Sequence, residues 1–139
     1  MSMTPRQIQL VQSTFRMVQP LGTMAADLFY KHLFEIEPTT TTLFKGDMKQ
    51  QGREFIQVLA IAVGGLSHTP TLVPLIQRLG LQHVSRGVQV QHYDSVRQAL
   101  LWMLALILQD AFTEEVRAAW STAYAMLAGI MKEAAYGQP

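Results

Sequence analysis

The chain has 139 residues, with a formal net charge of +1 at pH 7, 49% hydrophobic residues, 15% charged residues and no cysteine. This length suits one domain with a single buried core, and the sparse, scattered charge argues against a disordered chain, a nucleic-acid binder and a protein drawn electrostatically to membranes. The absence of cysteine excludes disulfides, thiolate metal sites, iron–sulfur clusters and a cysteine nucleophile.

The N-terminal segment and the apolar runs argue against export and against a membrane span. Residues 1–7 contain no apolar core and no small-residue cleavage site, so they do not form a secretory signal. The longest apolar run, Ala99 to Leu108, has ten residues, about half of the roughly 20 that cross a bilayer. The sequence therefore predicts a cytoplasmic protein with one domain over residues 1–139.

Helix signals begin close to the N-terminus. Thr4-Pro5-Arg6-Gln7 combines a hydroxyl cap, a proline at the first helical position and a glutamine three residues after the cap, and this first helix ends before Pro20. A second helix follows and ends at Pro38, with Tyr30 on its inward stripe. The four threonines at 39–42 favour only a short turn or a single helical turn.

A third helix is predicted from about Met48 to Leu66, and it aligns one amide, Gln51, with the apolar residues Phe55 and Val58. The next helix opens at residues 67–70 and is closed by Gly87.

Two further helices complete the predicted set. Apolar residues from Tyr93 to Ile107 make one face of the first, which is apolar almost all round after residue 99. Thr113 is expected to cap the last helix, with two glutamates in its first turn. Because no window alternates with period two and no repeat is visible, the predicted fold class is all-α, with about six long helices.

His83 is the residue around which a site is most readily predicted. It follows Leu72, Ile76 and Leu79 at intervals of four, three and four residues, so its imidazole shares a helical stripe with three aliphatic side chains. From spacing alone, it is either a neutral core histidine bonded to a backbone carbonyl or a ligand. His32 and His92 stand beside polar or charged residues, and we expect them to be solvated; His68 lies in a loop and is uninformative.

Enzyme motifs give little guidance. The chain has no Gly-rich phosphate loop, no HExxH and no GxSxG nucleophile elbow. What remains is a helical core with an inward histidine, tyrosine and glutamine among many apolar side chains. This pattern fits a ligand pocket, and it also fits an ordinary core.

A series of short motifs nevertheless runs in a characteristic order along nearly the whole chain. The motifs are Leu28-Phe29-Tyr30-Lys31-His32-Leu33-Phe34, Pro38, Leu43-Phe44, Gln51-Gly52-Arg53, Val58-Leu59, His83, Gly87-Val88, His92-Tyr93, Ala119-Trp120 and Tyr124. In order and spacing the set resembles the single-domain bacterial globins and the haem domain of flavohaemoglobins. The resemblance implies a globin fold packed around haem b.

The resemblance also implies a role for each matching residue. His83 becomes the proximal iron ligand, a neutral imidazole whose second nitrogen is oriented by a neighbouring carbonyl or side chain. Arg53 and Arg86 become candidate partners of the haem propionates. The implied haem site comprises Phe44 on the haem face, Tyr30, Gln51 and Phe55 on the distal side, Val88 and Tyr93 on the proximal side, and Val58, Leu79, His83 and Arg86.

The expected distal chemistry is hydrogen bonding to a bound gas. Dioxygen held at the iron carries partial negative charge, so Tyr30 and Gln51 would each stabilise it by roughly 1–2 kcal/mol, or about five- to thirty-fold in affinity. In the ferric state the iron would be open, water-bound or ligated by Tyr30. The chain departs from flavohaemoglobins at Ala135, where they place a glutamate, and from many relatives at Phe55 and at Leu81-Gln82.

These implications leave several functions open. The first is a haem protein that binds dioxygen, nitric oxide or carbon monoxide. The second is a nitric oxide dioxygenase, which would need an external reductase because the chain stops at Pro139 without a flavin or nicotinamide domain. A gas sensor, a haem-free stress sensor and a plain helical interaction module are the remaining alternatives, and the oligomeric state is left open.

Overall fold

The computed structural model describes residues 3–137, and over this range the protein is built from helices joined by short connectors, with no strand. The all-α prediction is therefore confirmed. The α-helices are α1 (Pro5–Val18), α2 (Gly22–Ile36), α3 (Met48–Gly64), α4 (Thr69–Ser85), α5 (His92–Leu108) and α6 (Glu114–Tyr136), and the short 3₁₀ helices are η1 (Gln19–Leu21), η2 (Pro38–Leu43), η3 (Gly65–Ser67) and η4 (Gln109–Ala111).

The helix ends follow the local signals in the sequence. Thr4 and Gln7 form a reciprocal capping box at α1, with the Gln7 N–H donating to Thr4 Oγ1 at 3.1 Å and the Thr4 N–H donating to Gln7 Oε1 at 2.9 Å. Thr113 caps α6 by accepting from the Val116 N–H at 3.2 Å. Gly87 has a φ of +98°, in the left-handed region, and lies just after the end of α4. The predicted helix boundaries are confirmed within a few residues.

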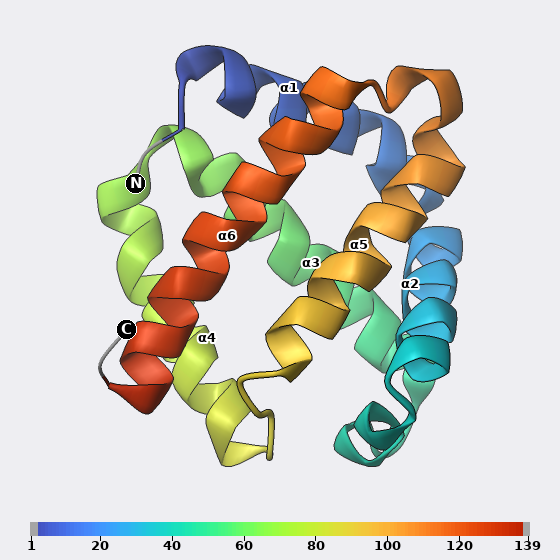
Figure 1. The fold of residues 1–139 in the computed structure, drawn as a ribbon, viewed down its shortest axis with the longest axis vertical. Helices are drawn as coiled ribbons and strands as arrows, with labels where there is room; N and C mark the ends of the chain where they lie inside the picture. The colour runs from blue at the N-terminus through green and yellow to red at the C-terminus, as the bar shows by residue number, and fades with distance from the viewer. Residues whose placement is uncertain (1–2, 138–139) are drawn as a thin grey trace.

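Several helices pack on partners that are not their nearest neighbours in the chain. α4 lies along α6, and α2 lies along α5 and also packs on α3. In Figure 1, α5 and α6 cross the near face of the molecule, with α4 on one side and α2 on the other, and α3 passes behind them. α3 and α4 do not pack broadly against one another. The space between these two helices is where a site can form.

Two glycines allow the helices on either side of that space to sit where they do. A Cβ at Gly80 of α4 would lie 2.5 Å from the carbonyl oxygen of Met131 in α6. A Cβ at Gly52 of α3 would lie 3.0 Å from the Cβ of Ala26 in α2. The glycines thus let α4 approach the α6 backbone and α3 approach α2.

The core is built mainly from α1, α2, α5 and α6, with further buried residues from α3 and α4, and it contains one polar pair. Trp120 Nε1 donates to Thr14 Oγ1 at 2.9 Å, and that hydroxyl donates to the Leu10 carbonyl at 2.7 Å. The pair is satisfied internally, as buried polar groups usually are. Among the fully buried side chains the largest are Leu33, Leu72, Met103, Leu104, Val11, Val18 and Thr40.

The prediction that His92 is solvated is wrong, and so is that for His32. His92 is 6% exposed, and its Nδ1 accepts a hydrogen bond from the Gln89 N–H at 2.9 Å, which anchors the turn before α5. His32 is half-buried and stacks on Trp102 with ring centroids 4.3 Å apart. His68 is exposed just before α4. Polar neighbours in sequence did not reveal which helix would cover each ring.

Within residues 3–137, no helix combines the length and the hydropathy needed to span a membrane.

Candidate functional site

Two pockets lie along the facing sides of α3 and α4. The larger, of about 540 Å³, is lined by Thr42, Leu43, Lys45, Asp47, Gln50, Gln51, Glu54 and Arg86. The smaller, of about 180 Å³, is lined by Val58, Ile61, Leu75, Ile76, Arg78, Leu79 and Gln82. The α3 and α4 residues of both pockets recur at helical spacing along one face of each helix, whereas Thr42, Leu43, Lys45 and Asp47 come from the segment before α3. We call the two pockets together the α3–α4 crevice.

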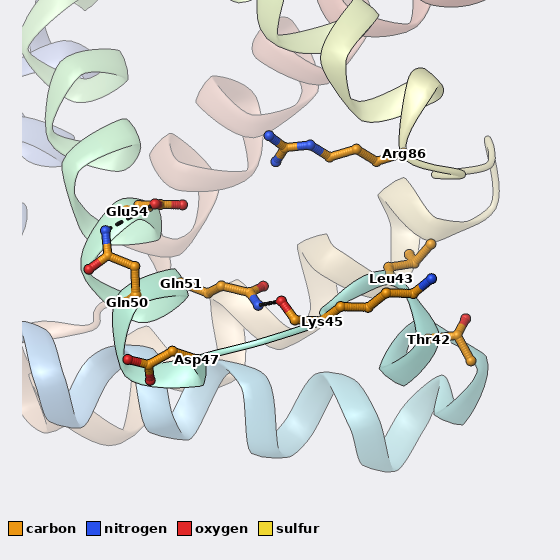
Figure 2. A pocket seen from close by; sticks show the side chains of 8 residues that line it. All are labelled: Thr42, Leu43, Lys45, Asp47, Gln50, Gln51, Glu54 and Arg86. Atoms are coloured by element: carbon orange, nitrogen blue, oxygen red, sulfur yellow. Dashed lines mark hydrogen bonds between the residues drawn. The ribbon is translucent and has the colours of Figure 1, made fainter.

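The two ends of the crevice differ in polarity. Val58, Ile61 and Leu75 at the smaller pocket are 38%, 56% and 42% exposed, which is high for aliphatic side chains that face one another. The larger pocket carries two cations, Lys45 and Arg86, and two carboxylates, Asp47 and Glu54. Figure 2 shows Arg86 reaching from the end of α4 across the gap above Gln51. Exposed apolar walls with a few polar groups at one end are typical of a ligand site.

His83 lies on α4, four residues after Leu79 of the smaller pocket and three before Arg86 of the larger one, and it lines neither pocket itself. Its Nδ1 lies 2.8 Å from the Leu79 carbonyl oxygen. Because a carbonyl only accepts, Nδ1 carries the proton and donates, and Nε2 keeps its lone pair. Burial lowers the pKa of His83 below its ordinary value and the Arg86 charge lowers it further, against the opposing effect of the Leu79 bond. The imidazole is therefore neutral, half-buried and able to act as a ligand through Nε2.

An aromatic cluster from α2, the connector and α3 lines neither pocket but contacts Gln51 of the larger one through Tyr30. The Tyr30 and Phe44 rings have centroids 4.9 Å apart in an edge-on arrangement, and the Phe29 and Phe55 rings stack at 4.2 Å. Tyr30 is 8% exposed, and its hydroxyl donates to the main-chain carbonyl of Gln51 over a long 3.4 Å. The cluster fixes the side of α3 that carries Gln51.

Gln51 reaches the pocket, and its amide already has a partner. Its Nε2 donates to the main-chain carbonyl of Lys45 at 2.8 Å, a bond that Figure 2 draws across the larger pocket. An amide nitrogen has two N–H groups, so one donor remains. We predicted that Tyr30 and Gln51 both donate hydrogen bonds to a bound gas. In the structure, each side chain already donates to a main-chain carbonyl of the protein. A gas ligand would have to recruit the second N–H of Gln51 and a rotated Tyr30 hydroxyl.

Because the phenol of Tyr30 is buried, we expect its ionisation to lower the free energy of unfolding at alkaline pH. Burial raises the pKa of Tyr30 to about 12, with a smaller contribution from Glu54. The folded state therefore holds the phenol proton more tightly than the unfolded state, and this stabilisation is complete below pH 10 and is lost as pH rises from about 10 to about 12. Urea unfolding at several pH values should show the free energy of unfolding falling less steeply in Tyr30→Phe than in the native protein. Equal slopes would contradict a buried, protonated Tyr30.

The residues after His83 form a second cluster, which lines neither pocket. Tyr93 is 5% exposed, and its hydroxyl is the one buried side-chain polar atom without a hydrogen-bond partner within residues 3–137. The Tyr136 hydroxyl donates to the Val88 carbonyl, and the Tyr124 hydroxyl to the Tyr93 carbonyl, each at 2.7 Å. A buried hydroxyl without a partner costs free energy of folding, and nothing in the two pockets lies against this one.

The crevice contains residues that the sequence did not single out. Lys45, Ile61 and Leu75 line it, whereas Arg53 lines neither pocket and instead donates to the Gln50 side chain. Ile61 and Leu75 extend helical stripes and could have been found by spacing. Lys45 lies in an irregular connector, where periodicity gives no signal.

His83 offers a metal one protein ligand. Over the described part of the chain, no group of three or more His, Cys, Asp or Glu residues gathers into a metal site.

Comparison with known sequences identifies the family to which these features correspond. Residues 27–131 match the family model described as Globin. The curated relatives include flavohemoproteins of Vibrio cholerae, Xylella fastidiosa and Deinococcus radiodurans, which are 28%, 31% and 32% identical over 92%, 95% and 93% of the chain. The chain covers 33%, 34% and 33% of them, so it spans about a third of their length.

Solved structures share the helical arrangement. A hexacoordinated heme protein from an anhydrobiotic tardigrade superposes with a TM-score of 0.86 at 18% identity, covering 95% of this chain and 94% of its own. A bacterial globin from Campylobacter jejuni gives 0.82 at 23% identity, with 94% and 95% covered. An engineered carbene transferase from Rhodothermus marinus, described as a candidate nitric oxide dioxygenase, gives 0.82 at 27% identity, with 94% and 91% covered. The predicted globin fold is confirmed.

Proposed function

Because the chain belongs to the globin family, we propose that it holds haem b in the α3–α4 crevice and binds dioxygen, nitric oxide and carbon monoxide there. The observation that supports this most is the bond between His83 Nδ1 and the Leu79 carbonyl, which leaves Nε2 as an unprotonated ligand beside the crevice. Without cysteine the chain cannot attach haem through thioether bonds, so the non-covalent b type is proposed. When bound, haem supplies an iron with one coordination position for a gas.

The lining of the crevice suits the parts of this cofactor. A porphyrin supplies four nitrogen ligands to its iron, so the protein needs to supply only one more, and the imidazole of His83 can do so. The apolar side chains of Val58 and Leu79 suit the ring, and the cations Lys45 and Arg86 suit the two propionates. Phe44 packs on Tyr30 at the edge of the larger pocket and would close that side of the site.

The distal residues suit stabilisation of a bound, partly negative gas. The second N–H of Gln51 is available as a donor, and the raised pKa of Tyr30, about 12, keeps its phenol protonated near neutral pH. In the structure the Tyr30 hydroxyl donates to the main-chain carbonyl of Gln51. We propose that it keeps a donor role, and that ferric iron in this site is open or water-bound and not ligated by Tyr30.

Absorption spectra test the proposed function directly. The purified protein, reconstituted with haem if necessary, should show a Soret band that shifts on reduction with dithionite and again on exposure to carbon monoxide. A globin known to take up haem, treated in parallel, controls for the reconstitution. Failure to take up haem where the control does would overturn the proposal and favour a plain helical interaction module.

Removal of the distal amide should mainly accelerate release of oxygen. Gln51→Leu deletes one donor worth roughly 1–2 kcal/mol, so the oxygen dissociation rate should rise about five- to thirty-fold, with the carbon monoxide rate much less affected. Stopped-flow displacement of oxygen measures it. Gln57→Leu, at an exposed position of α3 outside both pockets, is the matched control and should leave the rate unchanged. Equal oxygen release in both variants would remove Gln51 from the distal site.

Nitric oxide dioxygenase activity is the alternative, and two comparisons favour it. The curated relatives are flavohemoproteins, and one structural neighbour is described as a candidate nitric oxide dioxygenase. The reaction combines one dioxygen with one nitric oxide to give nitrate, and one electron must then return the iron to the ferrous state. We propose that an external flavin reductase supplies that electron. Nitrate formed in proportion to nitric oxide consumed, in the presence of such a reductase, would support this alternative; nitrosylated protein without turnover would contradict it.

A further inference from the structure

We propose that the connector Lys45-Gly46-Asp47, between η2 and α3, is a positioning element for the Gln51 amide. The main-chain carbonyl of Lys45 holds the amide with its nitrogen at the larger pocket, so that the remaining N–H faces an incoming gas. This inference rests on the proposed function, because it concerns how the distal donor is oriented.

The contacts of Gln51 carry the first step. Its side-chain Nε2 donates to the Lys45 carbonyl at 2.8 Å, its main-chain N–H donates to the Asp47 carbonyl at 3.1 Å, and its own carbonyl accepts from Tyr30. The residue is thus held by the connector through both its side chain and its backbone. In Figure 2 the side chain extends from α3 towards Lys45, over the floor of the larger pocket.

The shape of the connector turns the Lys45 carbonyl towards Gln51. Gly46 has a φ of +94°, in the left-handed region that side chains other than glycine rarely adopt. On one side Phe44 packs against Tyr30, and on the other Asp47 caps α3 by accepting from the Lys49 N–H at 2.9 Å. Because both ends are anchored, the conformation at Gly46 determines where the Lys45 carbonyl points.

The chemistry of the amide makes that carbonyl selective. A glutamine amide can present either its nitrogen or its oxygen after a half-turn, and only the nitrogen can donate to a carbonyl. An amide oxygen at the pocket would repel a partly negative gas, whereas the free N–H attracts it. The Lys45 carbonyl therefore selects the orientation that stabilises the ligand before the ligand arrives, which is preorganisation of a donor.

Gly46→Ala offers a clean test because a Cβ at this position meets no atom within 4 Å, so the substitution disfavours the positive φ without a clash. Gly137→Ala is the matched control, since Gly137 also has a positive φ, +85°, and equally open surroundings, but lies at the end of α6. In haem-loaded protein we expect Gly46→Ala to accelerate oxygen release about two- to tenfold, the worth of one hydrogen bond, with Gly137→Ala unchanged.

A double-variant cycle shows whether the effect passes through the amide. In a Gln51→Leu background Gly46→Ala should change oxygen release little, because the group that the connector positions is gone. Nitrogen-15 NMR of the carbon monoxide complex should also show one Gln51 side-chain proton exchanging slowly with solvent in the native protein, and faster in Gly46→Ala.

The outcomes separate the two proposals. Oxygen release that is unchanged in Gly46→Ala, or an effect that is equally large with Leu at position 51, overturns the connector's role while leaving haem binding intact. Absence of a Soret band in the native protein overturns the proposed function, and with it the need to position a donor.

Discussion

His83→Ala should remove the protein's ability to hold haem in a defined coordination state. The substitution deletes the imidazole whose Nδ1 is bonded to the Leu79 carbonyl and whose Nε2 is left unprotonated. We expect the affinity for haem to fall by more than about 100-fold, beyond the roughly 10- to 100-fold that follows loss of a group that only orients a metal ligand. The Soret absorbance after reconstitution and the rate of haem transfer to an acceptor apoprotein measure the loss.

His68→Ala is the control for this prediction. His68 is exposed immediately before α4, the same helix that carries His83, and its replacement should leave the spectrum unchanged. Added imidazole should partly restore the native spectrum of His83→Ala, since it can occupy the space left by the side chain. A native spectrum in His83→Ala without added imidazole would show that another residue ligates the iron, and His83 would then be an ordinary carbonyl-bonded histidine.

Gly80→Ala should destabilise the fold and the haem site together. The added methyl group would lie 2.5, 2.8 and 2.9 Å from the carbonyl oxygen, Cα and carbonyl carbon of Met131, all of them backbone atoms that cannot rotate away. Relieving this overlap requires α4 to move from α6, at a cost of about 1–3 kcal/mol in the free energy of unfolding. Urea unfolding followed by circular dichroism measures the cost, and faster haem loss is expected because α4 also carries His83.

Gly129→Ala, on α6, should have the opposite effect and raise the free energy of unfolding. A Cβ there meets nothing within 4 Å, so alanine should stabilise the helix by roughly 0.5–1 kcal/mol through the reduced flexibility of the unfolded chain. The two variants make the same chemical change in helices that pack on one another. If both shifted stability in the same direction, the close contact at Gly80 would not be what determines the position of α4.

Local chemistry in the sequence was enough to predict the helices. Signals that act within one helical turn can be recognised in the sequence without tertiary structure. They include the capping box at Thr4 and Gln7, the break at Pro20 and the cap at Thr113. The spacing of Leu79 and His83 predicted that the two residues share one stripe of their helix, and the structure joins His83 Nδ1 to the Leu79 carbonyl. The family motifs added the haem site as an expectation, and the comparisons confirm the family and the fold.

Only the tertiary structure decided which faces were covered and which were left open. Polar neighbours suggested that His92 was solvated, yet the turn at Gln89 buries it. Lys45 reaches the crevice from an irregular connector, and the carbonyl that holds Gln51 belongs to a residue six positions away. Sequence periodicity reports the faces within one helix, whereas the α3–α4 crevice exists because α3 packs on α2 and α4 packs on α6, contacts between segments distant in the chain.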